Sequence, residues 1–85
     1  MDEQIMYSFL LALNSPEGRI RKFKDVFKTF GEEQSYLVLK HLINNAYIVG
    51  LIIDTVADGS KMFNITTQTA VTPKGICFIE DYNRA

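Results

Sequence analysis

The chain has 85 residues, a formal net charge of −1 and a hydrophobic content of 47%, which includes six Phe and four Tyr. This length and composition predict one small folded domain over residues 1–85 and exclude a disordered chain. The overall charge does not indicate a nucleic-acid binder, but five of the nine Lys and Arg residues lie between Arg19 and Lys28, opposed only by Asp25.

Cysteine and histidine are too sparse for a disulfide or a zinc site. Cys77 is the only cysteine and His41 the only histidine, and neither has the partner spacing of a metal site or of a catalytic pair. We interpret Cys77 as a buried or half-buried structural thiol and His41 as an outward-facing polar residue. We therefore expect no metal and no cofactor.

The sequence gives no sign of export or of a membrane span. The first residues after Met1 are acidic, where a secretory signal needs basic residues. Every apolar run is far shorter than the roughly 20 residues that cross a bilayer. A reduced, cytoplasmic setting without membrane contact is the expectation.

Three amphipathic helices are predicted in the first half of the chain. Asp2 can cap the first helix, Gly31 can end the second, and Glu32 and Glu33 favour the start of a third that runs to about Asn45. Apolar residues recur at helical spacing in each of them. The expected buried stripes are Ile5, Met6, Phe9, Leu10 and Leu13; Ile20, Phe23, Val26, Phe27 and Phe30; and Tyr36, Leu39, Ile43 and Ala46, with Leu42 at the edge of the third and Ser35 alongside.

The second half predicts a β-hairpin followed by a short helix. The expected strands are residues 47–54 and 62–69, joined by a two-residue turn at Asp58-Gly59 that would place Ile52 opposite Ile65. Thr72 can cap the final helix and Pro73 suits its first position. Both faces of this hairpin would be apolar, so either the helices or a second chain must cover them. The dimer-interface candidates are Leu51 and Ile53.

The order helix, helix, helix, strand, strand, helix predicts an α+β winged helix-turn-helix domain with the hairpin as its wing. The residues 46–50 (AYIVG) and 71–76 (VTPKGI), with the aromatic and acidic tail that follows, resemble the YjcQ-like winged-helix family of small bacterial and phage-associated proteins. Val71 stands where that family usually has Leu. The resemblance implies the fold over the whole chain and does not define a ligand.

The first functional hypothesis is a small DNA-binding transcriptional regulator that acts as a homodimer. The third helix would enter the major groove, and the second helix and the wing would contact phosphates. The base-edge candidates are Gln34, His41, Asn44 and Asn45, and the phosphate candidates are Arg21, Lys24, Lys28 and Lys61. Against this, Glu32 and Glu33 would repel phosphates at the start of the third helix, whose outward face offers only Lys40 as a cation.

The alternative is a protein-protein interaction module, such as a phage or mobile-element adaptor, that uses the same fold. It rests on the net negative charge and on apolar residues expected at the surface. These are Leu37, Val38, Leu51 and Ile53. The chain lacks phosphate-binding loops and paired carboxylates beside a cleft, so we expect neither an enzyme nor a small-molecule site.

Overall fold

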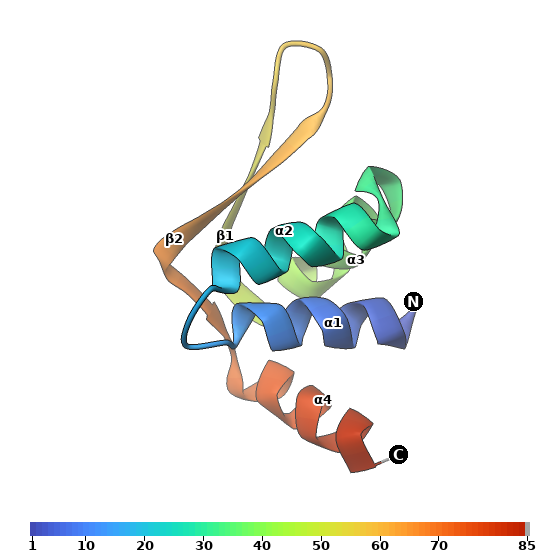
Figure 1. Cartoon of the computed structure of the whole chain (residues 1–85), viewed down its shortest axis with the longest axis vertical. Helices are drawn as coiled ribbons and strands as arrows, with labels where there is room; N and C mark the ends of the chain where they lie inside the picture. Colours follow the sequence, from blue (N-terminus) through green and yellow to red (C-terminus); the bar gives the residue numbers. More distant parts are fainter. Residues whose placement is uncertain (85) are drawn as a thin grey trace.

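The computed structural model describes residues 1–84, which form four helices and one antiparallel hairpin in the predicted order. The elements are α1 (Glu3–Leu13), α2 (Arg19–Phe30), α3 (Glu32–Asn44), β1 (Ile48–Thr55), β2 (Lys61–Val71) and α4 (Pro73–Arg84). Figure 1 places α1 between the other helices, with α4 on the side away from the hairpin. The predicted α+β layout of three helices, a hairpin wing and a C-terminal helix is confirmed.

The helix ends follow the predicted caps. The Asp2 carboxylate accepts hydrogen bonds from the N–H groups of Gln4 and Ile5 at 3.0 and 3.2 Å. Thr72 accepts the N–H of Gly75 at 3.2 Å, and its hydroxyl donates to the Ala46 carbonyl at 2.6 Å. The bonds from Gln4, Ile5 and Gly75 satisfy N–H donors that the first turn of a helix leaves open, whereas the bond to Ala46 satisfies a carbonyl just beyond α3. Thr72 therefore both starts α4 and ties it to the end of α3.

The core is built around α1, and α2 contributes less to it than predicted. All five residues of the α1 stripe are buried, together with Ala12. On α2 only Phe23 is buried, whereas Val26, Phe27 and Phe30 are half-buried. Ile20 is 52% exposed, so its assignment to the core was wrong. It lies in the first turn of α2 and lines a small open cleft with Asn64 and Ile65 of β2.

The buried face of α3 is rotated from the predicted one. Ser35, Val38, Leu39 and Leu42 are buried, whereas Tyr36 and Ile43 are half-buried and Ala46 lies exposed beyond the helix end. Val38, expected near the surface, is only 1% exposed. The small Ser35 side chain explains the rotation, because it permits close packing on α2 and its hydroxyl lies 3.4 Å from the Phe27 carbonyl oxygen.

The hairpin turn has three residues, not the two predicted. Residues 57–59 form the loop, closed by hydrogen bonds from Val56 N–H to Ser60 O and from Gly59 N–H to Val56 O. Gly59 has φ +88°, a conformation that suits glycine in such loops. The N–H and hydroxyl of Ser60 both donate to Asp58, and these bonds, the hydroxyl foremost, lower the pKa of that carboxyl.

The longer turn moves the strand register by one residue. Ile52 pairs with Asn64 instead of Ile65, and Ile53 pairs with Phe63. A shift of one residue exchanges the faces of a strand. Leu51 is consequently only 8% exposed and belongs to the core, so its assignment to a dimer interface was wrong. Ile53 is half-buried, whereas Ile52 on the opposite face is 49% exposed.

A bulge interrupts the hairpin near its base. Leu51 pairs with Ile65 but Val49 pairs with Ala70, so residues 66–69 of β2 lie opposite Gly50 alone. The buried Thr69 hydroxyl donates to the Gly50 carbonyl at 2.7 Å. Gly50 has φ +75°, and a Cβ on it would lie 2.7 Å from the carbonyl carbon of Gln68. Both the backbone angle and the close approach therefore require glycine here.

Gly50→Ala and Gly59→Ala form a matched pair that separates these two effects. Both positions have positive φ, but a Cβ at Gly59 would meet no atom within 4 Å. We expect Gly59→Ala to lower the free energy of unfolding by about 1 kcal/mol, from backbone strain alone. Gly50→Ala should cost about 2–4 kcal/mol, because the bulge must also open. Urea unfolding followed by circular dichroism measures both, and equal losses would contradict the close-approach argument.

Candidate functional site

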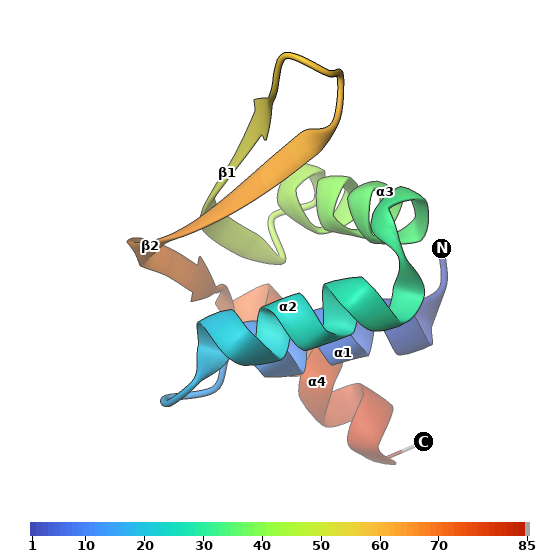
Figure 2. The same ribbon diagram turned by 45° about the horizontal axis from the view of Figure 1, so that its top comes forward.

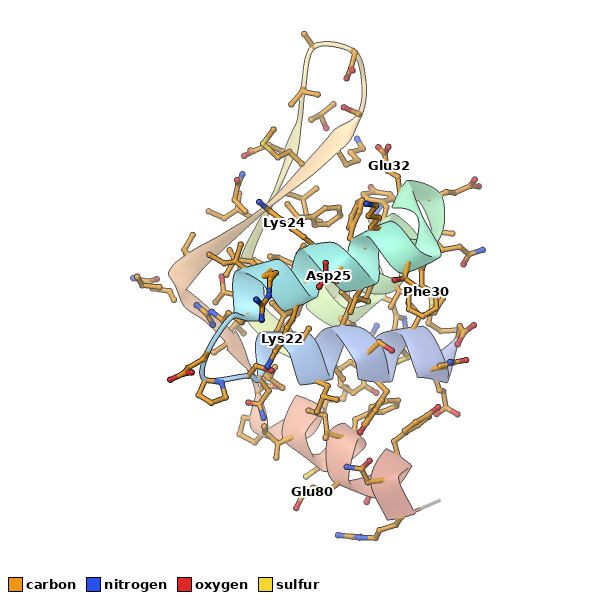
Figure 3. The ribbon with its side chains drawn as sticks, in the orientation of Figure 1. Lys22, Lys24, Asp25, Phe30, Glu32 and Glu80 are labelled. Atoms are coloured by element: carbon orange, nitrogen blue, oxygen red, sulfur yellow. The ribbon has the colours of Figure 1, made fainter. Side chains whose placement is uncertain are left out.

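An open cleft of about 480 Å³ lies between α2 and the outer part of β2. Its lining residues come from α2, from the start of α3 and from the strand that leaves the hairpin turn. They are Phe23, Lys24, Phe27, Lys28, Gly31, Glu32, Lys61, Met62 and Phe63. Figure 3 shows Lys24 extending from α2 toward the hairpin, with Glu32 near the far end of α2. The cleft is therefore formed by residues distant in sequence.

Aromatic rings form the floor of this cleft. The Phe63 ring centroid lies 5.6 Å from that of Phe27, 6.3 Å from that of Phe23 and 6.2 Å from that of Tyr36. These separations are those of favourable tilted aromatic pairs. Phe63 thus packs the wing against both helices of the helix-turn-helix, and Figure 2 shows the hairpin inclined over α3.

Lysines from three elements surround this aromatic cluster. Lys24 and Lys28 of α2 line the cleft together with Lys61 of β2. The Lys61 ammonium lies 5.6 Å from the centre of the Tyr36 ring and donates to the Thr55 hydroxyl at 2.9 Å. Lys40 of α3 lies 5.7 Å from the same ring. Three of the four predicted phosphate ligands therefore lie around one cleft. Lys40 lies near them, because it and Lys61 both contact the Tyr36 ring.

The fourth predicted phosphate ligand, Arg21, is exposed on α2 and does not line the cleft. Lys22 lies on another side of the helix, where it lines a separate open cleft with Tyr7 and Leu11 of α1. The run of basic residues on α2 is thus divided among different surfaces. Of Arg21, Lys22, Lys24 and Lys28, only Lys24 and Lys28 line the cleft beside the wing.

Acidic residues stand at one end of the cleft. Glu32 accepts a hydrogen bond from the Lys61 N–H at 3.4 Å, and Glu33 lies with it beside Tyr36 and Lys61. The predicted obstacle to phosphate binding is therefore present at the wing side of α3. The cleft has a cationic side and an acidic end.

The base-edge candidates on α3 fall into two pairs. Gln34 and Asn44 are exposed and carry no local role among the described contacts. The Asn45 amide instead donates to the His41 carbonyl at 2.9 Å and lies 3.2 Å from His41 Nδ1. The Asn45 side chain therefore caps a carbonyl of the last turn of α3 and also contacts the half-buried His41 ring. The Gln34 and Asn44 amides make no hydrogen bond within residues 1–84.

Arg19 has a structural role that the sequence did not indicate. Its guanidinium donates to the carbonyl oxygens of Thr69 and Thr66, both at 2.6 Å. These carbonyls lie in the bulge of β2, so Arg19 ties the start of α2 to the hairpin. Only contacts across 50 and 47 positions of the chain reveal this, and charge clustering gave no signal for it.

Replacing Arg19 should destabilise the fold because two charge-assisted hydrogen bonds are lost. We expect Arg19→Met to lower the free energy of unfolding by about 1–3 kcal/mol. Arg21→Met on the same helix is the control, with a change within about 0.5 kcal/mol. Urea denaturation of the two variants beside the wild-type chain measures the difference. Similar stabilities for both variants would argue against the tie.

No metal site and no membrane-spanning helix are found in residues 1–84. No group of three His, Cys, Asp or Glu side chains there could hold an ion, and no helix is long and apolar enough to cross a bilayer. Cys77 is exposed on α4, so the prediction that it is buried or half-buried was wrong. Phe78 and Ile79, next to it, face the core instead.

No family model, curated protein or solved structure matches the chain. The resemblance to the YjcQ-like family therefore stays a prediction from the residues that carry it.

Proposed function

We propose that the protein binds duplex DNA as a winged helix, with α3 as the recognition helix and the wing beside it. The observation that carries this proposal is the convergence of Lys24, Lys28, Lys40 and Lys61 from α2, α3 and β2. Cations from these three elements are those that contact phosphates when α3 lies in a major groove. On this proposal the chain is a small cytoplasmic regulator of transcription, of bacterial or phage origin.

Specificity on this proposal comes from the exposed side of α3. The amides of Gln34 and Asn44 can each pair bidentately with adenine. Glu32 and Glu33 lower the net positive charge of the surface, so we expect modest affinity that depends strongly on salt.

Neutralising the converging lysines tests the proposal. In wild-type protein at about 50 mM salt we expect a Kd in or below the range of about 10⁻⁴–10⁻⁶ M for a duplex of arbitrary sequence. Lys24→Gln, Lys28→Gln and Lys61→Gln together should reduce the slope of log Kd against log salt by about 3, since each phosphate contact contributes about 1. Fluorescence anisotropy with a labelled duplex of about 20 base pairs measures both quantities.

Lys22→Gln is the matched control because Lys22 lies on α2 but faces α1. It should leave the salt slope within the error of the measurement. Absence of duplex binding by the wild-type chain, or equal slopes for the triple variant and the wild type, would overturn the proposal.

The DNA-binding proposal includes a homodimer that reads two half-sites. The exposed apolar residues Val49 and Ile52 of β1 are the surface that such a dimer would bury, now that Leu51 is assigned to the core. Ile52→Lys should abolish the dimer while leaving the free energy of unfolding of the monomer within about 0.5 kcal/mol. Sedimentation velocity at tens of micromolar tests this, and a monomeric wild-type chain would contradict it.

A second candidate, a protein-interaction module, is favoured by a different observation. The floor of the cleft is apolar and aromatic, and hydrated phosphates have no reason to fill it. An apolar side chain of a partner protein would gain from leaving water there. This candidate needs no catalytic residue.

A further inference from the structure

We infer that the cleft between α2 and β2 binds an extended segment of a partner protein in which apolar side chains are flanked by Asp or Glu. The inference deepens the interaction-module candidate and does not depend on DNA binding. Three features carry it: the aromatic floor, the charge on the walls and the free edge of β2.

The floor fits an apolar anchor. Phe23, Phe27 and Phe63 form a mutually packed set, and Met62 beside them is 50% exposed. The volume of about 480 Å³ lies in the usual range for binding pockets, about 300–1,000 Å³. A second, smaller cleft continues along α2 and β2, past Phe23 and Lys24 to the exposed Ile20. The two together form a groove that can take more than one side chain.

The charge of the walls selects acidic flanks. Lys24 and Lys28 stand along the α2 side and Lys61 on the β2 side, all lining the cleft. Glu32 is the one carboxylate in the lining. A peptide whose carboxylates lie toward Lys24 and Lys28, with a neutral or basic residue near Glu32, is complementary to this pattern. The charge pattern therefore places the acidic residues of the peptide beside Lys24 and Lys28 and its neutral or basic residue beside Glu32.

The free edge of β2 favours an extended conformation. The sheet has two strands, so β2 pairs with a strand on one side only, and beside the cleft the Lys61 N–H is bonded to the Glu32 carboxylate. Met62 and Phe63 are adjacent and therefore point to opposite faces, yet both line the cleft, which places the cleft at the strand's edge. A peptide strand added at this edge would form main-chain hydrogen bonds with β2, and every second side chain of the peptide would contact the aromatic floor of the cleft.

Selection from a displayed library of random peptides tests the inference. Extended peptides of about ten residues, at about 3.3 Å per residue, are about 33 Å long and can extend beyond both ends of the cleft. Against the wild-type chain, we expect enrichment of sequences with Phe, Leu, Ile, Met or Trp flanked by two or more acidic residues. The best peptide is then synthesised, and its Kd is measured by fluorescence anisotropy and its contact surface by NMR shift mapping. No enrichment, enrichment of basic peptides, or shifts confined to α1 and α4 would overturn the inference.

Three variants test the groups involved. Lys24→Glu with Lys28→Glu should weaken the synthesised peptide by about tenfold or more, whereas the control Lys22→Glu should change its Kd by no more than about twofold. Met62→Gln retains every charge and should weaken the peptide by about fivefold through lost apolar contact. Circular dichroism melts verify that each variant is folded. Unchanged peptide affinity in the folded Lys24, Lys28 variant or in folded Met62→Gln would overturn the inference.

Duplex DNA titrated against the same variants separates this inference from the DNA-binding proposal. Binding of DNA that Met62→Gln leaves unchanged, with the peptide weakened, supports the peptide cleft whatever the role of α3. If the chain does not bind DNA, only the DNA-binding proposal is rejected. If no peptide is selected or the variants do not weaken it, only the inference about the cleft is rejected.

Discussion

The bulge at Gly50 is the constraint on which the arrangement of the wing depends. Residues 66–69 of β2 lie opposite this one residue of β1, which displaces the pairing toward the turn by three positions. Side chains alternate between faces with a period of two, so an odd displacement reverses the face that each residue of β2 presents. The bulge thereby turns Phe63 and Ile65 to the side of Leu51, toward the helices.

Arg19 links this bulge to α2. Its guanidinium holds two carbonyls of the bulge, and the helix that it begins carries Phe23, Phe27 and the lysines of the cleft. The two walls of the cleft are therefore fixed at one end by Arg19 and near the other by the packing of Phe63 on Phe27. An interaction of no direct functional role thus sets where Lys24 and Lys61 stand relative to each other.

The sequence predicted the elements of the fold because their signals are local. Asp2, Gly31, Thr72 and Pro73 act within a turn of their own positions, and the six elements occur in the predicted order. Register and side-chain facing were predicted less well because they depend on distant contacts. The three-residue turn and the bulge moved Leu51 into the core, and the fit of Ser35 against α2 rotated Val38 inward. For the same reason the sequence grouped the cations of α2 as one cluster, although Arg19 bonds the bulge, Lys22 lies beside α1, and Lys24 and Lys28 line the cleft.

The lysines alone do not distinguish a nucleic acid from an acidic peptide, since both ligands are anionic. Glu32 distinguishes them better, because it lies in the cleft lining and hydrogen-bonds Lys61 of the opposite wall. A phosphate backbone carries a charge at every nucleotide and cannot avoid this carboxylate while following the cleft. A peptide can place a neutral or basic residue there and its acidic residues by Lys24 and Lys28. Duplex DNA would therefore lie along the exposed side of α3 and reach the lysines from outside, leaving the aromatic floor to a protein ligand.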